Sequence, residues 1–344
     1  MIKNFIGKNK FLKKIKNKTT TFILAGSVTQ TCEIEGITQA GIPGVIHLTP
    51  TLDAEFVDSG KLFSLENMAE TPKGVPTPAI ITRAIKQLTG FEFETLDLGL
   101  RVKPQVSKLH DIGIQESKSI VEGAEINAKE IIQKGIDFAK NYTHANELLI
   151  FGESTPSGTT TAYAVGKTLG YASDGYFSSS FLNAPSSLKE QVVNQALENA
   201  SGDIYERLGS VADNMLLFTA GFVSAYSKKG KIILGGGTQM AAVLLIVDAL
   251  DLEIVSENVA LMTTKWVYED ANSNIKALLE QLKFDIDGYY SDFTFKDANI
   301  PVLKLYDEGE AKEGVGAGAA LCYAQMLGHS NEEILAQIEK VLTS

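Results

Sequence analysis

Short apolar stretches alternate with longer stretches of helical periodicity along almost the whole chain. This alternation is typical of an α/β fold, because consecutive parallel strands must be joined by a crossover that is usually a helix. A parallel sheet covered by helices is therefore the predicted architecture. We predict strands over residues 22–27, 45–48, 91–98, 148–151, 231–234, 259–263 and 301–305.

Two of the predicted helices have particular sequence signals. Residues 120–138 repeat apolar side chains at helical spacing, which predicts one long helix with an apolar face. Residues 330–342 predict a helix that begins with a capping box, since Ser330 and Glu333 have the spacing that this motif requires.

The chain has no internal repeat and no long linker, which argues against two independent domains in series. We predict a single catalytic unit over residues 19–344. It would contain a large α/β domain at about 20–305 and a small helical part built from the N-terminal segment and about 314–344. Residues 1–18 carry seven lysines and no acidic residue, and we expect a basic, solvated lead-in helix there.

Charge and cysteine content restrict the possible partners and the compartment. The formal net charge is −11, and because the first eighteen residues contribute seven positive charges, the remainder carries −18. Such a surface repels polyanions, so a nucleic-acid partner is not expected. The leader lacks the continuous apolar core of a signal peptide and is too charged to span a membrane, so stable membrane insertion is not expected either. Cys32 and Cys322 make neither a zinc pattern nor a disulfide framework, and these features together predict a cytoplasmic protein.

A loop rich in glycine and hydroxyl residues, GESTPSGTTT, follows the predicted strand at 148–151. Unpaired backbone N–H groups and the positive end of the helix dipole make such a junction suitable for a phosphate. The lysine of a P-loop is missing, which disfavours a magnesium-dependent nucleoside triphosphatase. A tight turn with capping threonines explains the same residues equally well. The residues of the predicted phosphate cradle are Gly152, Ser154, Ser157, Gly158, Thr159 and Thr160.

A second loop of this kind follows the predicted strand at 231–234, where Gly235, Gly236 and Gly237 precede Thr238 and a long apolar helix. Three consecutive glycines cost backbone entropy that a simple connection does not require. Both loops leave the carboxyl edge of the predicted sheet, where α/β proteins bind ligands. We therefore expect one extended ligand to bridge them.

The third segment of interest is KEGVGAGAA, in which Glu313 stands at the start of a run of glycine and alanine. Little side-chain bulk surrounds this carboxylate, so burial can raise its pKa toward the range that is useful for proton abstraction. The alternative is an ordinary glutamate at a helix N-terminus, stabilised by the helix dipole. The residues by themselves favour that alternative.

In their order and separation, GESTPSGTT, LGGGTQMAA and KEGVGAGAA resemble the nicotinate-nucleotide:dimethylbenzimidazole phosphoribosyltransferase family. The closer similarity is to its divergent branch, best known from archaea, which TPKGVPTPAIITRA, LGLRVKP and SSSFLNAPSSLKEQVV also resemble. The resemblance covers roughly residues 20 to 328. The N-terminal part departs from the better-studied bacterial enzymes, so their benzimidazole-contacting residues cannot be placed here.

The resemblance implies a Rossmann-like parallel sheet, a small helical subdomain from both chain termini, and a homodimer. It also implies transfer of phosphoribose from nicotinate mononucleotide to an aromatic base of the benzimidazole type, giving an α-ribazole phosphate for the lower loop of cobamides. No metal and no cofactor is expected. Alternatives that remain open are a purine or phenolic acceptor and a non-catalytic pyridine-nucleotide-binding protein.

Residue roles follow from the same resemblance. Glu313 falls on the family's catalytic glutamate and would act as general base. Glu153 would hold the ribose hydroxyls and stabilise the cationic sugar ring. Gly158, Thr159 and Thr160 would bind the phosphate with Lys189, while Ser157 stands where the family motif has glycine.

Overall fold

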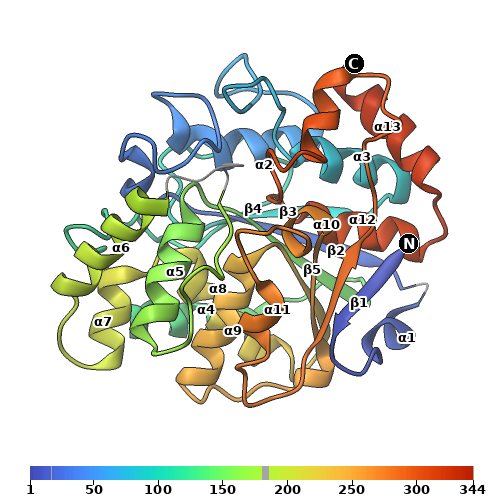
Figure 1. Cartoon of the computed structure of the whole chain (residues 1–344). Helices are drawn as coiled ribbons and strands as arrows, with labels where there is room; N and C mark the ends of the chain where they lie inside the picture. The colour runs from blue at the N-terminus through green and yellow to red at the C-terminus, as the bar shows by residue number, and fades with distance from the viewer. Residues whose placement is uncertain (17, 180–185, 344) are drawn as a thin grey trace.

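The computed structural model describes residues 1–16, 18–179 and 186–343. These residues form an eight-stranded sheet in the order β1-β8-β7-β6-β5-β2-β3-β4, parallel except for β1, with helices on both faces (Figure 1). The predicted α/β class is confirmed. The strands are β1 (Ile2–Ile6), β2 (Thr20–Gly26), β3 (Glu92–Asp97), β4 (Leu109–Asp111), β5 (Leu148–Ser154), β6 (Lys231–Gly235), β7 (Val259–Thr264) and β8 (Asp287–Ser291).

Two predicted strands are wrong. Residues 45–48 contain the 3₁₀ helix η2 (Ile46–Leu48), and residues 301–305 lie in the 3₁₀ helix η4 (Pro301–Tyr306). Both stretches are short and apolar, and such runs do not by themselves distinguish a strand from a tight helical turn. Pro301 fits the first turn of a helix, where its missing N–H has no intrahelical partner to lose.

The lead-in helix predicted for residues 1–18 is also wrong in its first part. β1 is an edge strand that pairs antiparallel with β8, a strand that was not predicted. The carboxylate of Asp287 then accepts backbone N–H groups of Asn9, Lys10 and Phe11, which turns the chain into the short helix α1 (Phe11–Ile15).

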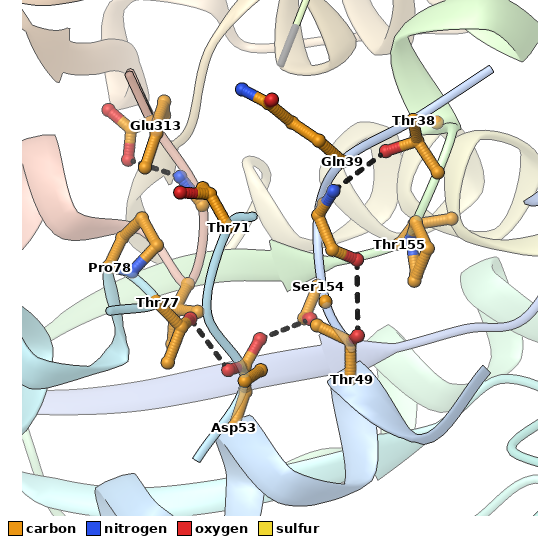
Figure 2. A pocket seen from close by; sticks show the side chains of 18 of the residues that line it. Thr38, Gln39, Thr49, Asp53, Thr71, Thr77, Pro78, Ser154, Thr155 and Glu313 are labelled. Atoms are coloured by element: carbon orange, nitrogen blue, oxygen red, sulfur yellow. Dashed lines mark hydrogen bonds between the residues drawn. The ribbon is translucent and has the colours of Figure 1, made fainter. Parts of the chain in front are cut away.

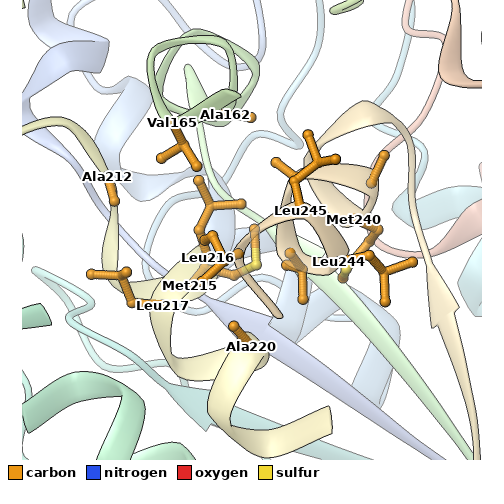
Figure 3. Packing of buried hydrophobic residues seen from close by; sticks show 14 of the residues in the cluster. Ala162, Val165, Ala212, Met215, Leu216, Leu217, Ala220, Met240, Leu244 and Leu245 are labelled. Atoms are coloured by element: carbon orange, nitrogen blue, oxygen red, sulfur yellow. The ribbon is translucent and has the colours of Figure 1, made fainter. Parts of the chain in front are cut away.

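Alternate residues of each central strand enter two separate cores, one on each face of the sheet. In β5, Leu149 and Phe151 join the first core, whereas Leu148 and Ile150 join the second. The first core is closed mainly by α4 (Ala128–Asn141), α5 (Gly158–Thr168), α8 (Asn214–Tyr226) and α9 (Thr238–Ala249), and Figure 3 shows part of its packing. The second is closed by α2 (Thr49–Ser59), α3 (Ala79–Thr89), α12 (Ala317–Met326) and α13 (Asn331–Thr343).

The remaining helices lie between these elements: α6 (Ser186–Asn199), α7 (Ile204–Val211), α10 (Lys265–Tyr268) and α11 (Ile275–Leu279), with the 3₁₀ helices η1 (Gln30–Glu33) and η3 (Ser256–Asn258). Among all the helices of the described ranges, none combines the length and the apolar character needed to cross a membrane. The division into a large and a small domain stays a prediction.

The two helices with particular sequence signals have different outcomes. The capping box at α13 is confirmed, since Glu333 N–H donates to Ser330 Oγ at 3.2 Å and Ser330 N–H donates to Glu333 Oε2 at 2.9 Å. The helix predicted over residues 120–138 is wrong in its first half, because α4 begins only at Ala128, after Asn127 as N-cap. Gly123, at φ +92°, lies in a turn that a continuous helix could not contain.

Candidate functional site

A cavity of about 820 Å³, partly open to solvent, lies where β5 ends. Two groups of residues line it. The glycine-rich lining consists of residues 153–159, Gln239 and residues 311–315. The threonine-rich lining consists of residues 38–41, Thr49, Asp53, residues 69–71 and residues 75–78 (Figure 2).

Glu313 belongs to the glycine-rich lining and is held by donors from two elements. Its Oε2 accepts from Thr264 N–H at 3.0 Å and from Thr263 Oγ1 at 3.2 Å, both at the end of β7. Its Oε1 accepts from Gly318 N–H at 3.1 Å, in the first turn of α12. Burial raises the pKa of Glu313 to about 7, although these donors act in the opposite direction. The residue is therefore both a helix N-terminal glutamate and a cavity-lining acid.

Glu153, at the end of β5, is 2% exposed and lines the same cavity. Gln239 Nε2 donates to its Oε1 at 3.3 Å. Burial, with a smaller contribution from the charge of Glu313, raises the pKa of Glu153 to about 8. Burial thus favours the protonated form of both acids, and of Glu153 more than of Glu313. The structure brings the two predicted catalytic acids together.

The predicted glycines mostly allow backbone segments to pack closely. A Cβ on Gly318 would lie 2.1 Å from the carbonyl carbon of Thr263, and one on Gly235 would lie 2.7 Å from Ala319 Cβ. A Cβ on Gly152 would lie 3.3 Å from Gly316 Cα. The start of α12 thus sits directly on the ends of β5, β6 and β7, which is how Glu313 reaches the cavity.

Part of the predicted binding set lies outside the cavity lining. Gly152, Gly235, Gly236 and Gly237 form the packed layer behind it, and Thr238 is fully buried, accepting from Ser178 N–H at 3.2 Å. Their direct contact with a ligand stays a prediction.

The loop that begins α5 does contribute to the cavity. Ser157, Gly158 and Thr159 line it, whereas Thr160 is buried beside them without lining it. Ser157 has φ +60°, a conformation that glycine adopts without strain, which explains why the family motif has glycine there. A Cβ on Gly158 would lie 1.9 Å from Gln239 Oε1, so glycine at 158 makes room for that amide.

Lys189, on α6, is half-buried and does not line the cavity. Its Nζ donates to the carbonyl of Ser178 at 2.7 Å, next to the cavity-lining Ser179. Burial, together with the positive charge of Lys312, lowers the pKa of Lys189 to about 7. Residues 180–185 of the segment that carries the resemblance around Lys189 lie outside the described residues.

Sequence reasoning missed several lining residues. Asp53, on α2, is 2% exposed; its Oδ1 accepts from Thr77 Oγ1 at 2.8 Å and its Oδ2 from Ser154 Oγ at 2.7 Å. Burial raises the pKa of Asp53 to about 6. Lys312 and Gln239 were within quoted motifs but were not chosen, and for Asp53 the sequence offered no local signal.

Within the described ranges, no group of three or more histidine, cysteine or acidic side chains is arranged to hold a metal ion. The charges at the cavity are instead carboxyl groups and the ammonium of Lys312, which pairs with Asp270 at 2.8 Å.

Comparison with known proteins shows the family and the fold. No family model matches the chain. A UPF0284 protein of Sulfurisphaera tokodaii is 36% identical over 330 residues, covering 95% of this chain and 94% of the relative. A UPF0284 protein of Methanocaldococcus jannaschii is 37% identical over 333 residues, covering 93% and 92%. The crystal structure of nicotinate-nucleotide-dimethylbenzimidazole phosphoribosyltransferase from Thermus thermophilus superposes with a TM-score of 0.61 at 16% identity, covering 96% of this chain and 88% of that one. The chain therefore belongs to the UPF0284 family and has the fold of that phosphoribosyltransferase.

Proposed function

We propose that this protein is a phosphoribosyltransferase that moves the phosphoribosyl group of nicotinate mononucleotide to a base of the benzimidazole type. The products are nicotinate and α-ribazole 5′-phosphate, the nucleotide for the lower loop of cobamides. The observation that carries the proposal is the meeting of two carboxyl groups, Glu153 and Glu313, in one cavity at the end of β5. The fold shared with an enzyme named for this reaction supports it.

The chemical step requires a base next to the acceptor. A nitrogen of the acceptor attacks C1′ of the ribose, the C1′–N bond to nicotinate breaks, and its electron pair neutralises the pyridinium ring. Glu313 takes the azole N–H proton, which increases the electron density of the attacking nitrogen. Its pKa of about 7 suits this role, because a general base works best when its pKa lies near the working pH.

Glu153 binds the ribose hydroxyls in this scheme. The resemblance also gave it the task of stabilising the cationic sugar ring. A neutral carboxyl group stabilises positive charge less than a carboxylate, and the pKa of Glu153 near 8 keeps the group neutral before the reaction. We therefore assign Glu153 to hydroxyl binding.

The phosphate is assigned to the end of the cavity lined by Ser157, Thr159 and Lys312. The first turn of α5 supplies the positive end of the helix dipole there, whereas the N–H groups of Gly158 and Thr160 already donate to the carbonyls of Thr155 and Ser157. Lys189 lies behind Ser178 with its pKa lowered to about 7, so a bound phosphate would favour its charged form. Holding the phosphate fixes C1′ relative to Glu313, and such positioning is a large part of catalysis in group transfer.

Two alternatives are weighed against this proposal. A purine or phenolic acceptor is favoured by the threonine-rich lining, in which Asp53 and several hydroxyls offer hydrogen bonds that a dimethylated benzene ring cannot use. A non-catalytic pyridine-nucleotide-binding protein is disfavoured, because binding alone gains nothing from a buried proton acceptor such as Glu313.

One assay separates the three possibilities. The purified protein is incubated with nicotinate mononucleotide and, in turn, dimethylbenzimidazole, adenine and a phenol, and nicotinate release is followed by chromatography. Release with benzimidazoles supports the proposal. Release only with adenine or the phenol would mean that the protein is a transferase with a purine or phenolic acceptor. If no base causes release of nicotinate but calorimetry shows that the nucleotide binds, the result supports a non-catalytic pyridine-nucleotide-binding protein.

The resemblance also predicts a homodimer that needs neither a metal nor an organic cofactor. Sedimentation equilibrium tests the first expectation. Turnover measured before and after treatment with EDTA tests the second expectation, and it should be unchanged if no metal is needed.

A further inference from the structure

Two buried polar atoms at the cavity have no hydrogen-bond partner among the described residues: Gln239 Oε1 and Thr155 Oγ1. Gln239 is 9% exposed, Thr155 is 7% exposed, and both line the cavity. Buried polar atoms in folded proteins almost always have a partner, so an orphan that lines a cavity points to a bound molecule as its partner. A ligand with hydrogen-bonding groups at this place would satisfy both atoms.

Both residues flank the same acid. The amide nitrogen of Gln239 donates to Glu153 Oε1 at 3.3 Å, and the backbone of Thr155 acts to lower the pKa of the same carboxyl group. The loop is shaped around the amide, since a Cβ on Gly158 would lie 1.9 Å from Gln239 Oε1. Gln239 is thus fixed with one end on Glu153 and with an unsatisfied acceptor at its other polar atom.

The chemistry of the missing partner follows from these groups. An amide oxygen only accepts, so the ligand must present an O–H or N–H donor to Gln239. A threonine hydroxyl both donates and accepts, so one ligand hydroxyl can satisfy the two residues in turn. The polar groups next to a reacting anomeric carbon are the sugar hydroxyls, and the 2′-hydroxyl is the nearest of them.

We infer that Gln239 and Thr155, together with Glu153, form a site that reads the 2′-hydroxyl of the donor, so that the protein selects ribosyl over 2′-deoxyribosyl nucleotides. The inference rests on the proposed function and adds to it the chemical class of sugar that the cavity accepts. Gln239 is the specificity-determining residue, because its orphan oxygen loses its partner when that hydroxyl is absent.

The experiment compares nicotinate release from nicotinate mononucleotide and from its 2′-deoxy analogue, with the same acceptor base. Loss of the 2′-hydroxyl makes C1′ intrinsically more reactive, so the quantity compared is the ratio of the two kcat/KM values in each variant. Gln239→Met keeps the length of the side chain and removes the acceptor, and Thr155→Val keeps the shape and removes the hydroxyl. Gln133→Met, on the exposed face of α4, is the matched control.

We expect Gln239→Met to lower the ratio by about tenfold or more, through a loss with the ribonucleotide alone. Thr155→Val lowers it in the same direction, and the control leaves it unchanged. Thermal melts of each variant check that the fold is retained. If Gln239→Met does not fold, Thr155→Val tests the inference in its place. A ratio that both variants leave unchanged overturns the inference, as does an equal loss with both donors.

Failure of the proposed function gives a different result. If the wild-type protein releases nicotinate from neither donor with any acceptor, the transferase proposal and this inference fall together. If it releases nicotinate normally but the substitutions do not change the ratio, the transferase stands and only the sugar-reading site is overturned.

Discussion

The glycine-rich lining of the cavity is held by backbone packed on backbone, whereas the threonine-rich lining is held by hydrogen bonds between side chains. In the first, Val315 N–H donates to the carbonyl of Glu153 at 2.8 Å, and the start of α12 leaves no room for a Cβ at Gly318. In the second, Thr77 donates to Asp53 and Gln39 donates to Glu310 at 2.9 Å, while Ser154 of the glycine-rich lining donates to Asp53 and so joins the two linings.

This difference assigns different tasks to the two linings. Close backbone packing is stiff, so the glycine-rich lining can hold Glu313 and Glu153 at fixed positions for chemistry. Hydroxyl side chains can be exchanged one at a time with little change to the backbone. We therefore expect the glycine-rich lining to determine the reaction and the threonine-rich lining to determine which acceptor is used.

The largest expected effect is that of Glu313→Gln. The amide keeps the shape and some of the hydrogen bonds but cannot take a proton, so turnover falls by about 10²–10⁴-fold while the nucleotide still binds. Turnover with dimethylbenzimidazole and calorimetric affinity for nicotinate mononucleotide are the measurements. Glu308→Gln, at an exposed position, is the control. Turnover near the wild-type level would remove Glu313 from the role of base.

The next effect tests the backbone contact itself. Gly318→Ala would place a Cβ 2.1 Å from the carbonyl carbon of Thr263, so α12 must move away, at an expected loss of about 3 kcal/mol in the free energy of unfolding. Gly237→Ala is the matched control, because its Cβ meets only ordinary contacts, the nearest at 3.4 Å from Val267. Urea unfolding measures both. Equal losses in the two variants would mean that the contact at α12 is not tight.

The two linings also differ in how far the sequence predicts them. Local motifs predict the glycine-rich segments, because glycine before a helix leaves a signal within a few residues. The proposed roles of Glu153 and Glu313 come from the family resemblance instead, since the residues around Glu313 by themselves favour an ordinary helix N-terminal glutamate. The motifs do not show that Gly235 packs against α12, since that contact joins segments about eighty residues apart. Asp53 acquires its role only when α2 places it next to Thr77 and Ser154. No spacing of residues in the sequence predicts this contact.

The same limit explains the errors in the fold. The central strands are predictable because both of their faces are buried, which makes them continuously apolar. β1 resembles part of a helix in sequence because its lysine and asparagine face outward on an edge strand. Its pairing with β8 depends on residues almost three hundred positions away.

A third, smaller effect is a dependence of stability on pH. The ordinary pKa of a glutamate is 4.5, and that of Glu153 in the folded protein is about 8 because of its burial. Its contribution to stability is therefore complete below pH 4.5 and is lost as the pH rises toward 8, on the order of 2 kcal/mol between pH 6 and 8. Glu153→Gln should flatten this part of the profile in urea unfolding, and Glu66→Gln, at an exposed position, should not. Parallel profiles for the Glu153→Gln variant and the wild type would contradict the buried, protonated state.

The smallest effect concerns the threonine-rich lining. Glu310, with 3% of its side chain exposed, binds Lys73 and Gln39 and so joins two loops that line the cavity. Lys73→Met removes one partner of this acid, but because the lysine side chain is 57% exposed, the expected loss is only about 1 kcal/mol in the free energy of unfolding. Lys61→Met, at an exposed position, is the control. In kinetic assays we expect KM for the acceptor to change while kcat stays constant, because the loops shape the pocket without touching the reacting atoms. A fall in kcat as large as that of Glu313→Gln would mean that the threonine-rich lining takes part in the chemistry, and the division of tasks between the two linings would then be wrong.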